Sequence, residues 1–287
     1  MSEELFRVWH SVCEQEDFSP HGDFAAVHGH NMHELILVKS GVLNVKINEK
    51  EYVVPPKSLV IMSNIEMHLL TPIEFPYERY GLQVSIPAMK KIPLNISYFS
   101  ILANHPPHFN NVFDLSSCFE EFETLFKGME AECDSSVYAR PSRMLDEYSN
   151  DIMRFKISEL LLMLKRKFPE RFTQHKNKSD CTILQIQQYI DSNFAKDISI
   201  NELAKEAFIS HTSFINAFKK ITGYSPKHYL LMCRLAEAKS LLSSTSLTIS
   251  DIAFKIGFKD SNSFIRFFRQ ELGLTPGEYR KINYDIS

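Results

Sequence analysis

Hydrophobic positions follow two different periods along the chain. Up to about residue 110, short runs rich in β-branched residues are separated by turn residues, at positions 35–38, 42–47, 52–54, 59–62 and 80–86. Short strands that recur every ~8–12 residues are typical of a β-sandwich or barrel. Beyond residue 110 the apolar residues recur every three or four positions, which indicates amphipathic helices. The patterns therefore predict an α+β chain, with an N-terminal β-barrel, flanking helices and an all-α C-terminal part.

Four regions follow from the change of pattern. Residues 1–110 carry the strands, and residues 111–168 carry two amphipathic runs, the second of which contains Leu160–Leu164 and stops before Pro169. Residues 169–180 are polar and non-periodic, so we interpret them as a linker to a helical domain at 181–287. The apolar positions at Leu160–Leu164 exceed what one-sided packing needs, which favours self-association of this region; burial within the chain is the alternative.

An internal repeat dominates the C-terminal part. Residues 202–229 recur at 251–279, with an offset of 49 at Ala204 and Ala253 and of 50 from Ser213 and Ser263 onward. Each copy predicts a capped helix of about two turns, a tight turn and a second capped helix. The expected capping residues are Ser199 and Ser210 in the first copy and Thr248 and Asp260 in the second. One structural unit therefore occurs twice.

The second helix of each copy has an apolar face and a polar face. The apolar face carries phenylalanines at helical spacing, and the opposite face offers small polar and basic side chains. These are His211, Thr212, Ser213 and Asn216 in the first copy, and Ser261, Asn262, Ser263, Arg266 and Arg269 in the second, which Lys259 precedes. A short helix, a tight turn and such a second helix describe a helix-turn-helix that reads double-stranded DNA. Asn and Arg match the edges of adenine and guanine, while Ser, Thr, Lys and Arg suit phosphate.

Amphipathic helix pairs more often serve only to pack an interior, which is the alternative for each copy taken alone. The duplication, with matched Gly223 and Gly273 and matched Pro226 and Pro276, favours DNA reading. Between the copies, residues 225–242 predict one long helix. A spacing near ~34 Å would place the two readers in successive major grooves on one face of the duplex.

The repeated segments resemble the AraC/XylS family of transcription regulators. The resemblance covers Ser199–Tyr229 and Ile249–Arg280 and includes the stretches Arg234–Leu242 and Ile252–Arg269. It implies a seven-helix DNA-binding domain with two readers. The positions that contact bases in the family match Thr212, Ile215 and Asn216 in the first reader, and Ser261, Asn262, Ile265 and Arg266 in the second.

Two residues depart from the family pattern. Asn216 stands where a basic residue is frequent, and Phe208 stands where the turn often has glycine. A Phe forced into positive φ would cost on the order of 1 kcal/mol. The first reader is therefore expected to be looser or to have a differently shaped turn.

The N-terminal region resembles the cupin barrel. Gly22, His28, His30, Glu34 and Gly41 fit its first motif, and His68 falls where the second motif supplies another histidine, although Pro56-Lys57 replaces the usual Pro-Gly. In metal-dependent cupins these ligands, here His28, His30, Glu34 and His68, bind a divalent ion, and nitrogen and carboxylate donors suit that chemistry.

Regulators of the AraC type keep the same histidine-rich segment, here residues 28–35, without binding metal. On this alternative, which we prefer, the chain needs no cofactor and the side chains line a pocket for an organic effector at the barrel mouth. The residues expected there are His28, His30, His33, Glu34, His68 and Tyr80, with Tyr52, Arg79 and Gln83 as further polar candidates.

Cysteine content favours an intracellular protein, whereas the charge by itself does not decide for or against DNA binding. The formal net charge is -3, but residues 180–287 carry 13 Lys and Arg against 11 Asp and Glu, so the excess of acidic groups lies elsewhere. The five cysteines are scattered without a Cys-x-x-Cys pair, which favours reduced thiols over a disulfide or zinc framework. No apolar run approaches the ~18 residues of a membrane span, and the N-terminus lacks a secretion signal. We therefore expect a cytoplasmic protein without a membrane partner.

These patterns together predict a transcription regulator. By family habit it is an activator that dimerises with a second copy, senses a small-molecule effector and contacts RNA polymerase. One alternative is a metal-dependent cupin enzyme with a DNA-binding appendage, and another is a ligand-free regulator controlled by its abundance or by a protein partner. The sequence holds no Ser-His-Asp, P-loop or dinucleotide fingerprint, so other enzyme classes have no support.

Overall fold

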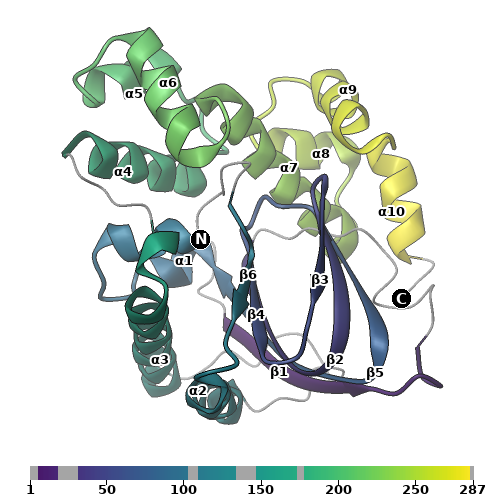
Figure 1. The fold of residues 1–287 in the computed structure, drawn as a ribbon. Helices are drawn as coiled ribbons and strands as arrows, with labels where there is room; N and C mark the ends of the chain where they lie inside the picture. The colour runs from purple at the N-terminus through teal and green to yellow at the C-terminus, as the bar shows by residue number, and fades with distance from the viewer. Residues whose placement is uncertain (1–5, 19–31, 103–108, 134–146, 173–177, 285–287) are drawn as a thin grey trace. The chain divides into compact units, whose positions relative to one another are not determined.

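The structure is a computed structural model that describes residues 6–18, 32–102, 109–133, 147–172 and 178–284 (Figure 1). The chain divides into two compact units, one made mainly of residues up to 175 and the other mainly of residues from 176 onward. The first unit is an antiparallel sheet with helices, and the second is helical. The α+β class predicted from the sequence is therefore confirmed.

The described residues of the sheet unit form six strands, all paired antiparallel. They are β1 (Phe6–Cys13), β2 (Met32–Ile47), β3 (Lys50–Val54), β4 (Ser58–Met62), β5 (His68–Ser85) and β6 (Val112–Asp114). Their order is β1-β5-β2-β4-β6, and β3 pairs with β2. The long strands β2 and β5 form the centre: β2 pairs with β5 along its whole length, with β4 along its first part and with β3 along its last part.

Strand β2 joins two runs that the sequence pattern separates. The turn expected at Ser40-Gly41 is instead a bulge, where the pairing register with β5 shifts between Val38 and Leu43. Gly41 lies at φ 72°, and a Cβ there would meet the carbonyl oxygen of Glu74 at 2.5 Å. Because only glycine fits both conditions, it permits the strand to bend and continue rather than to end.

Alternate residues of β2 enter two different cores. Ile36 and Val38 belong to a cluster on one face of the sheet, whereas Leu35 and Leu37 belong to a larger cluster on the other face. The larger cluster also takes in the helices α2 (Phe119–Cys133) and α3 (Glu147–Lys167). A strand buried on both faces shows a continuous apolar run, which explains why residues 35–38 do not alternate.

Short helical elements complete the sheet unit, and they extend into the predicted linker. They are α1 (Ile86–Met89), η1 (Ile96–Ile101) and η2 (Pro169–Arg171). Phe172 is buried in the larger core, and the Lys165 ammonium lies 4.7 Å from its ring centroid. The structure thus packs the chain onto the sheet unit as far as Phe172, although the surrounding residues are polar.

The apolar excess at Leu160–Leu164 is mostly satisfied within the chain. Leu160, Leu161 and Leu164 are buried in the larger core, and Leu162 is exposed. Intramolecular burial, the alternative raised from the sequence, therefore accounts for three of these side chains.

The helical unit consists of seven helices in the described residues from 178 to 284. They are α4 (Lys178–Asn193), α5 (Ile200–Glu206), α6 (His211–Thr222), α7 (Pro226–Ser244), α8 (Ile249–Lys255), α9 (Ser261–Leu272) and α10 (Pro276–Tyr284). The helix α7 contacts α4, α6 of the first repeat, and α8 and α10 of the second repeat (Figure 1). It is the long helix that the sequence predicts between the copies.

Local signals fix the helix ends of both copies. The N-caps of α5, α6, α8 and α9 are the four residues expected from the sequence, and each side chain accepts the backbone N–H three residues on. At the other end, Gly223 and Gly273 close α6 and α9 in the left-handed conformation, with φ 82° and 73°.

Candidate functional site

The two repeat copies fix their second helices in the same way. On α6, Phe214 and Phe218 are fully buried, and the Phe218 ring meets Tyr229 edge-on at 5.5 Å between centroids. On α9, Phe264 and Phe268 are fully buried, and the Phe268 ring meets Tyr279 edge-on, also at 5.5 Å. Edge-to-face aromatic pairs add specificity to apolar burial. Each helix is therefore held by the same aromatic pair and turns its other face outward.

The outward face of α6 carries the residues singled out in the first copy. His211, Thr212, Ser213 and Asn216 are exposed, and Ile215 is half-buried. Ser210 Oγ donates to Ser213 Oγ at 2.8 Å and accepts the Ser213 backbone N–H at 3.2 Å. The Ser213 side chain is thus engaged with the helix cap, whereas the nearby polar groups of Thr212 and Asn216 reach the surface.

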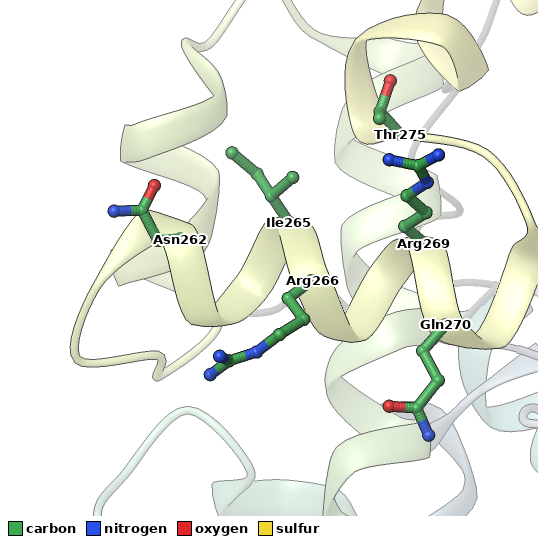
Figure 2. A pocket seen from close by; sticks show the side chains of 6 residues that line it. All are labelled: Asn262, Ile265, Arg266, Arg269, Gln270 and Thr275. Atoms are coloured by element: carbon green, nitrogen blue, oxygen red, sulfur yellow. The ribbon is translucent and has the colours of Figure 1, made fainter.

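The corresponding face of α9 is more basic. Asn262, Arg266 and Arg269 are exposed, and Ser261, Ser263 and Ile265 are half-buried. Figure 2 shows Arg266 and Gln270 extending from one side of the helix and Ile265 and Arg269 from another. An open hollow of about 440 Å³ lies along this face, lined by Asn262, Ile265, Arg266, Arg269, Gln270 and Thr275.

Gln270 and Thr275 were missed from the sequence. Gln270 follows Arg266 by four positions, so helical spacing alone could have placed it on this face. Thr275 comes from the next helix start, where its hydroxyl donates to the Glu278 carboxylate at 2.7 Å. No signal in the sequence ties that residue to α9.

The N-terminus of α9 is organised by one carboxylate. Asp260 accepts the Ser263 backbone N–H at 2.7 Å and the Ser263 hydroxyl at 2.8 Å. The backbone hydrogen bond from Ser263 is the largest cause that lowers the pKa of Asp260. Ser263 is therefore occupied by the cap, and Lys259 forms an ion pair with Asp197, Nζ to Oδ2 at 3.1 Å.

A buried polar cluster lies in the sheet unit, centred on His68. Its Nε2 lies 3.2 Å from Glu34 Oε2, and its Nδ1 lies 3.0 Å from the carbonyl oxygen of Glu66. Glu66 Oε2 in turn accepts the backbone N–H of Ser63 at 2.8 Å and Asn111 Nδ2 at 3.3 Å. Glu34 shares the strand face of Ile36, so the cluster belongs to the smaller of the two cores.

The expected effector residues do not all meet at this cluster. Glu34 and His68 are in contact, but His33 points to the opposite face of β2, and Tyr80 belongs to the core that packs against the helices. The Tyr80 ring stacks on His10 with centroids 4.6 Å apart. The sequence pattern could not assign these faces, because they depend on the register of β2 and β5.

The metal alternative has one contact in its favour. His28 and His30 lie outside the described residues, and among the residues that are described no three His, Cys, Asp or Glu side chains gather as metal ligands. Glu34 and His68, the two candidates that the structure does describe, form a pair with each other.

Comparisons with known proteins cover both units. A family model described as a helix-turn-helix domain matches residues 203–282, and one described as an AraC-like ligand binding domain matches residues 14–136. The chain belongs to the AraC family of transcription regulators. An AraC-family protein of this kind joins a DNA-binding helix-turn-helix domain to a ligand-binding domain, as the sequence predicted.

Relatives of this AraC-family chain are transcription regulators, which are not enzymes. It is 25% identical to the HTH-type transcriptional activator RhaS of Enterobacter sp. (strain 638), over 98% of this chain and 96% of that protein. It is 34% identical to the lactose operon transcription activator of Staphylococcus xylosus, over 46% of this chain and 48% of that protein. The first match spans both units, and the second spans about half of each protein.

Solved structures support the fold of the AraC-family chain. ToxT from Vibrio cholerae, in a crystal structure with bound unsaturated fatty acid, matches 98% of this chain and 98% of its own, with a TM-score of 0.56 at 13% sequence identity. At that identity the likeness concerns the fold alone. Across the residues described here, no helix is long and apolar enough to cross a bilayer.

Proposed function

We propose that this AraC-family regulator activates transcription from DNA sites that it reads with α6 and α9 together. The observation that carries this proposal is the matched geometry of the two copies. Each reading helix is locked by the same aromatic pair on its inner face, and each leaves polar side chains exposed on its outer face. An exposed polar face on a rigidly packed second helix is what insertion into a major groove requires.

The exposed side chains divide by chemistry. Arg266 can donate two hydrogen bonds to guanine, and Asn216 and Asn262 can pair with adenine. His211 and Arg269 suit phosphate oxygens, which hold the reader in register without sequence information. Ser213 and Ser263 are engaged by their helix caps, so their proposed role is to orient the helix start toward the duplex.

The sheet unit is the proposed sensor of a small-molecule effector. Its support is the family model for a ligand-binding domain and the buried polar cluster of Glu34, Glu66, His68 and Asn111. Effector binding would change the populations of two arrangements of the chain and so the affinity for DNA or for RNA polymerase. Relatives named as activators, RhaS and the lactose operon protein, support activation rather than repression.

A homodimer is proposed through the outer face of α3. Large apolar side chains on this helix are exposed at intervals of four, three and seven residues: Tyr148, Ile152, Phe155 and Leu162. This spacing places them along one stripe of the helix, and the exposed fraction reaches 80% at Tyr148 and 66% at Phe155. A second copy of the same stripe would remove these side chains from water.

The DNA proposal is tested by selecting bound fragments from a random-sequence duplex library with the full chain. We expect one motif with two half-sites about one helical turn, ~10 base pairs, apart. On the selected fragment, Arg266→Ala should weaken binding by about 1–3 kcal/mol and relax the preference at one base pair.

Lys227 provides the control for this test, because its side chain is exposed on α7 and it belongs to neither α6 nor α9. Lys227→Ala should preserve the motif at every position. An Arg266→Ala variant with unchanged affinity and unchanged sequence preference would remove Arg266 from the reading surface.

A further inference from the structure

The loop between α4 and α5 lies directly against the turn between α8 and α9. Gly257, in that turn, has φ 93°, and a Cβ on it would lie 2.6 Å from the carbonyl oxygen of Ala195 and 2.9 Å from its carbonyl carbon. Contacts this short leave no room for any side chain. The backbone of the loop that leads into the first copy therefore touches the backbone of the second copy.

Arg234, on α7, ties the same two segments together. Its Nε donates to the carbonyl oxygen of Phe194 at 2.8 Å, and its guanidinium NH2 donates to that of Lys196 at 3.0 Å. The guanidinium carbon also lies 5.5 Å from the ring centroid of Phe258, in the α8–α9 turn. One planar cation thus binds the α4–α5 loop by two hydrogen bonds and covers an aromatic ring of the second copy.

The first copy shows that the turn itself does not demand glycine. Phe208 occupies the position that matches Gly257, at φ 55°, and its side chain is 93% exposed. A left-handed turn at this position can therefore carry a bulky residue when nothing lies against it. At position 257 the approach of the Ala195 backbone excludes any side chain, and this contact joins the loop before the first copy to the second copy.

These contacts change how the two reading helices are connected. With α7 alone, the two helix pairs would be joined by a single helix, and bending or twisting at its ends would change their relative orientation. A second connection joins the α4–α5 loop to the α8–α9 turn directly. It is formed by Arg234, Gly257 and the backbone from Phe194 to Lys196. The exposed Lys259–Asp197 pair adds little by itself, because surface ion pairs are weak.

We propose that Arg234 and Gly257 are positioning residues that fix the spacing and relative rotation of α6 and α9. They make the regulator discriminate between DNA sites by the distance between half-sites. Neither residue needs to touch DNA for this effect. The proposal rests on the proposed function, in which both helices read the same duplex.

The test uses the full chain and a series of duplexes derived from its selected fragment. One or two base pairs are inserted or removed between the half-sites, and each base pair rotates one half-site against the other by roughly 35°. We expect wild type to lose at least about tenfold in affinity for each base pair of change, since misplaced contacts cost ~1–3 kcal/mol each. The affinity of Arg234→Ala should fall by less than about threefold over the same series, because its two reading helices can change their relative orientation.

The ratio of the affinities for duplexes of different spacing distinguishes a positioning role from a loss of stability. A variant that is merely less stable binds every duplex less well, which leaves that ratio unchanged. Gly257→Ala should reduce the dependence of affinity on spacing as Arg234→Ala does. Arg234→Lys keeps the charge but loses the planar guanidinium with its two donors, so its dependence on spacing should be intermediate between Arg234→Ala and wild type. The exposed-residue variant Lys227→Ala should reproduce the wild-type series.

Each outcome has a distinct meaning. If wild type binds no duplex specifically, the proposed function fails. If wild type binds but shows no preference for spacing, or if both Arg234→Lys and Arg234→Ala keep the wild-type ratio, the positioning role is overturned while DNA reading stands.

Discussion

A buried lysine in α7 gives a prediction whose size can be worked out. Lys239 is only 3% exposed, and burial lowers its pKa to about 7. In the unfolded chain a lysine keeps its proton up to pH ~10.4. Between these two values the unfolded state binds more protons than the folded state, so stability rises with pH. Below the folded pKa both states are charged, and the full cost of the buried charge is present.

Replacing Lys239 with Met removes the charge and keeps an unbranched side chain of similar length. From the two pKa values, wild type should gain about 2 kcal/mol in unfolding free energy between pH ~7 and pH ~9 from this group. Lys239→Met lacks that gain. The variant should therefore be more stable than wild type near neutral pH, and its advantage should shrink by the same amount as the pH rises.

Urea unfolding followed by far-UV circular dichroism measures the difference at each pH. Groups that titrate alike in both proteins, such as Tyr229 and Cys233, cancel in the comparison. Lys227→Met, at an exposed position of the same helix, should stay within about 0.5 kcal/mol of wild type. An advantage of Lys239→Met that stays constant from pH ~7 to pH ~9 would refute the reasoning, since it would mean that Lys239 keeps the same charge in both states.

Two other substitutions have defined outcomes. Phe208→Gly should raise the unfolding free energy by roughly 0.5 kcal/mol, because relief of the left-handed strain outweighs the added freedom of the unfolded chain; a lower melting temperature would contradict this. Phe155→Glu should convert the dimer to monomer in sedimentation equilibrium, with Glu120→Gln, at an exposed position of α2, as control. A wild-type chain that stays monomeric at micromolar concentration, or a variant that stays dimeric, would argue against the α3 interface.

Features set by neighbouring residues were predictable from the sequence. The helix caps and the left-handed glycines after α6 and α9 each depend on residues within a few positions of one another, and the two-copy arrangement is visible as a repeat at an offset of 49 or 50 residues. The departure of Phe208 from the family's glycine predicted a looser first reader or a differently shaped turn, and in the structure Phe208 adopts the left-handed conformation with φ 55°. The structure adds the comparison between the two turns: the Phe208 side chain is exposed, whereas the Ala195 backbone leaves no room for a side chain at Gly257.

Features set by strand register were not predictable in the same way. His33 and Glu34 are adjacent, yet the pleat of β2 sends them to opposite faces of the sheet. Tyr80 lies in the core that packs against the helices, because it pairs with Leu37 across the β2–β5 ladder. The bulge at Gly41 also changes which residues of β2 face which core, and a single glycine in a sequence does not distinguish a bulge from a turn.

Contacts between segments far apart in the sequence were the hardest to predict from it. The sequence places Arg234 on the long helix but gives no sign that it binds backbone carbonyl oxygens forty and thirty-eight residues earlier. Carbonyl acceptors leave no trace in side-chain patterns, so such contacts require coordinates.

In the proposed function, one chain inserts the two matched helices α6 and α9 into one duplex. Hydroxyl-radical footprinting of the full chain on its selected fragment tests this most directly. We expect each bound chain to protect two tracts about one helical turn, ~10 base pairs, apart on the same face of the DNA. A single protected tract, or two tracts on opposite faces, would contradict it.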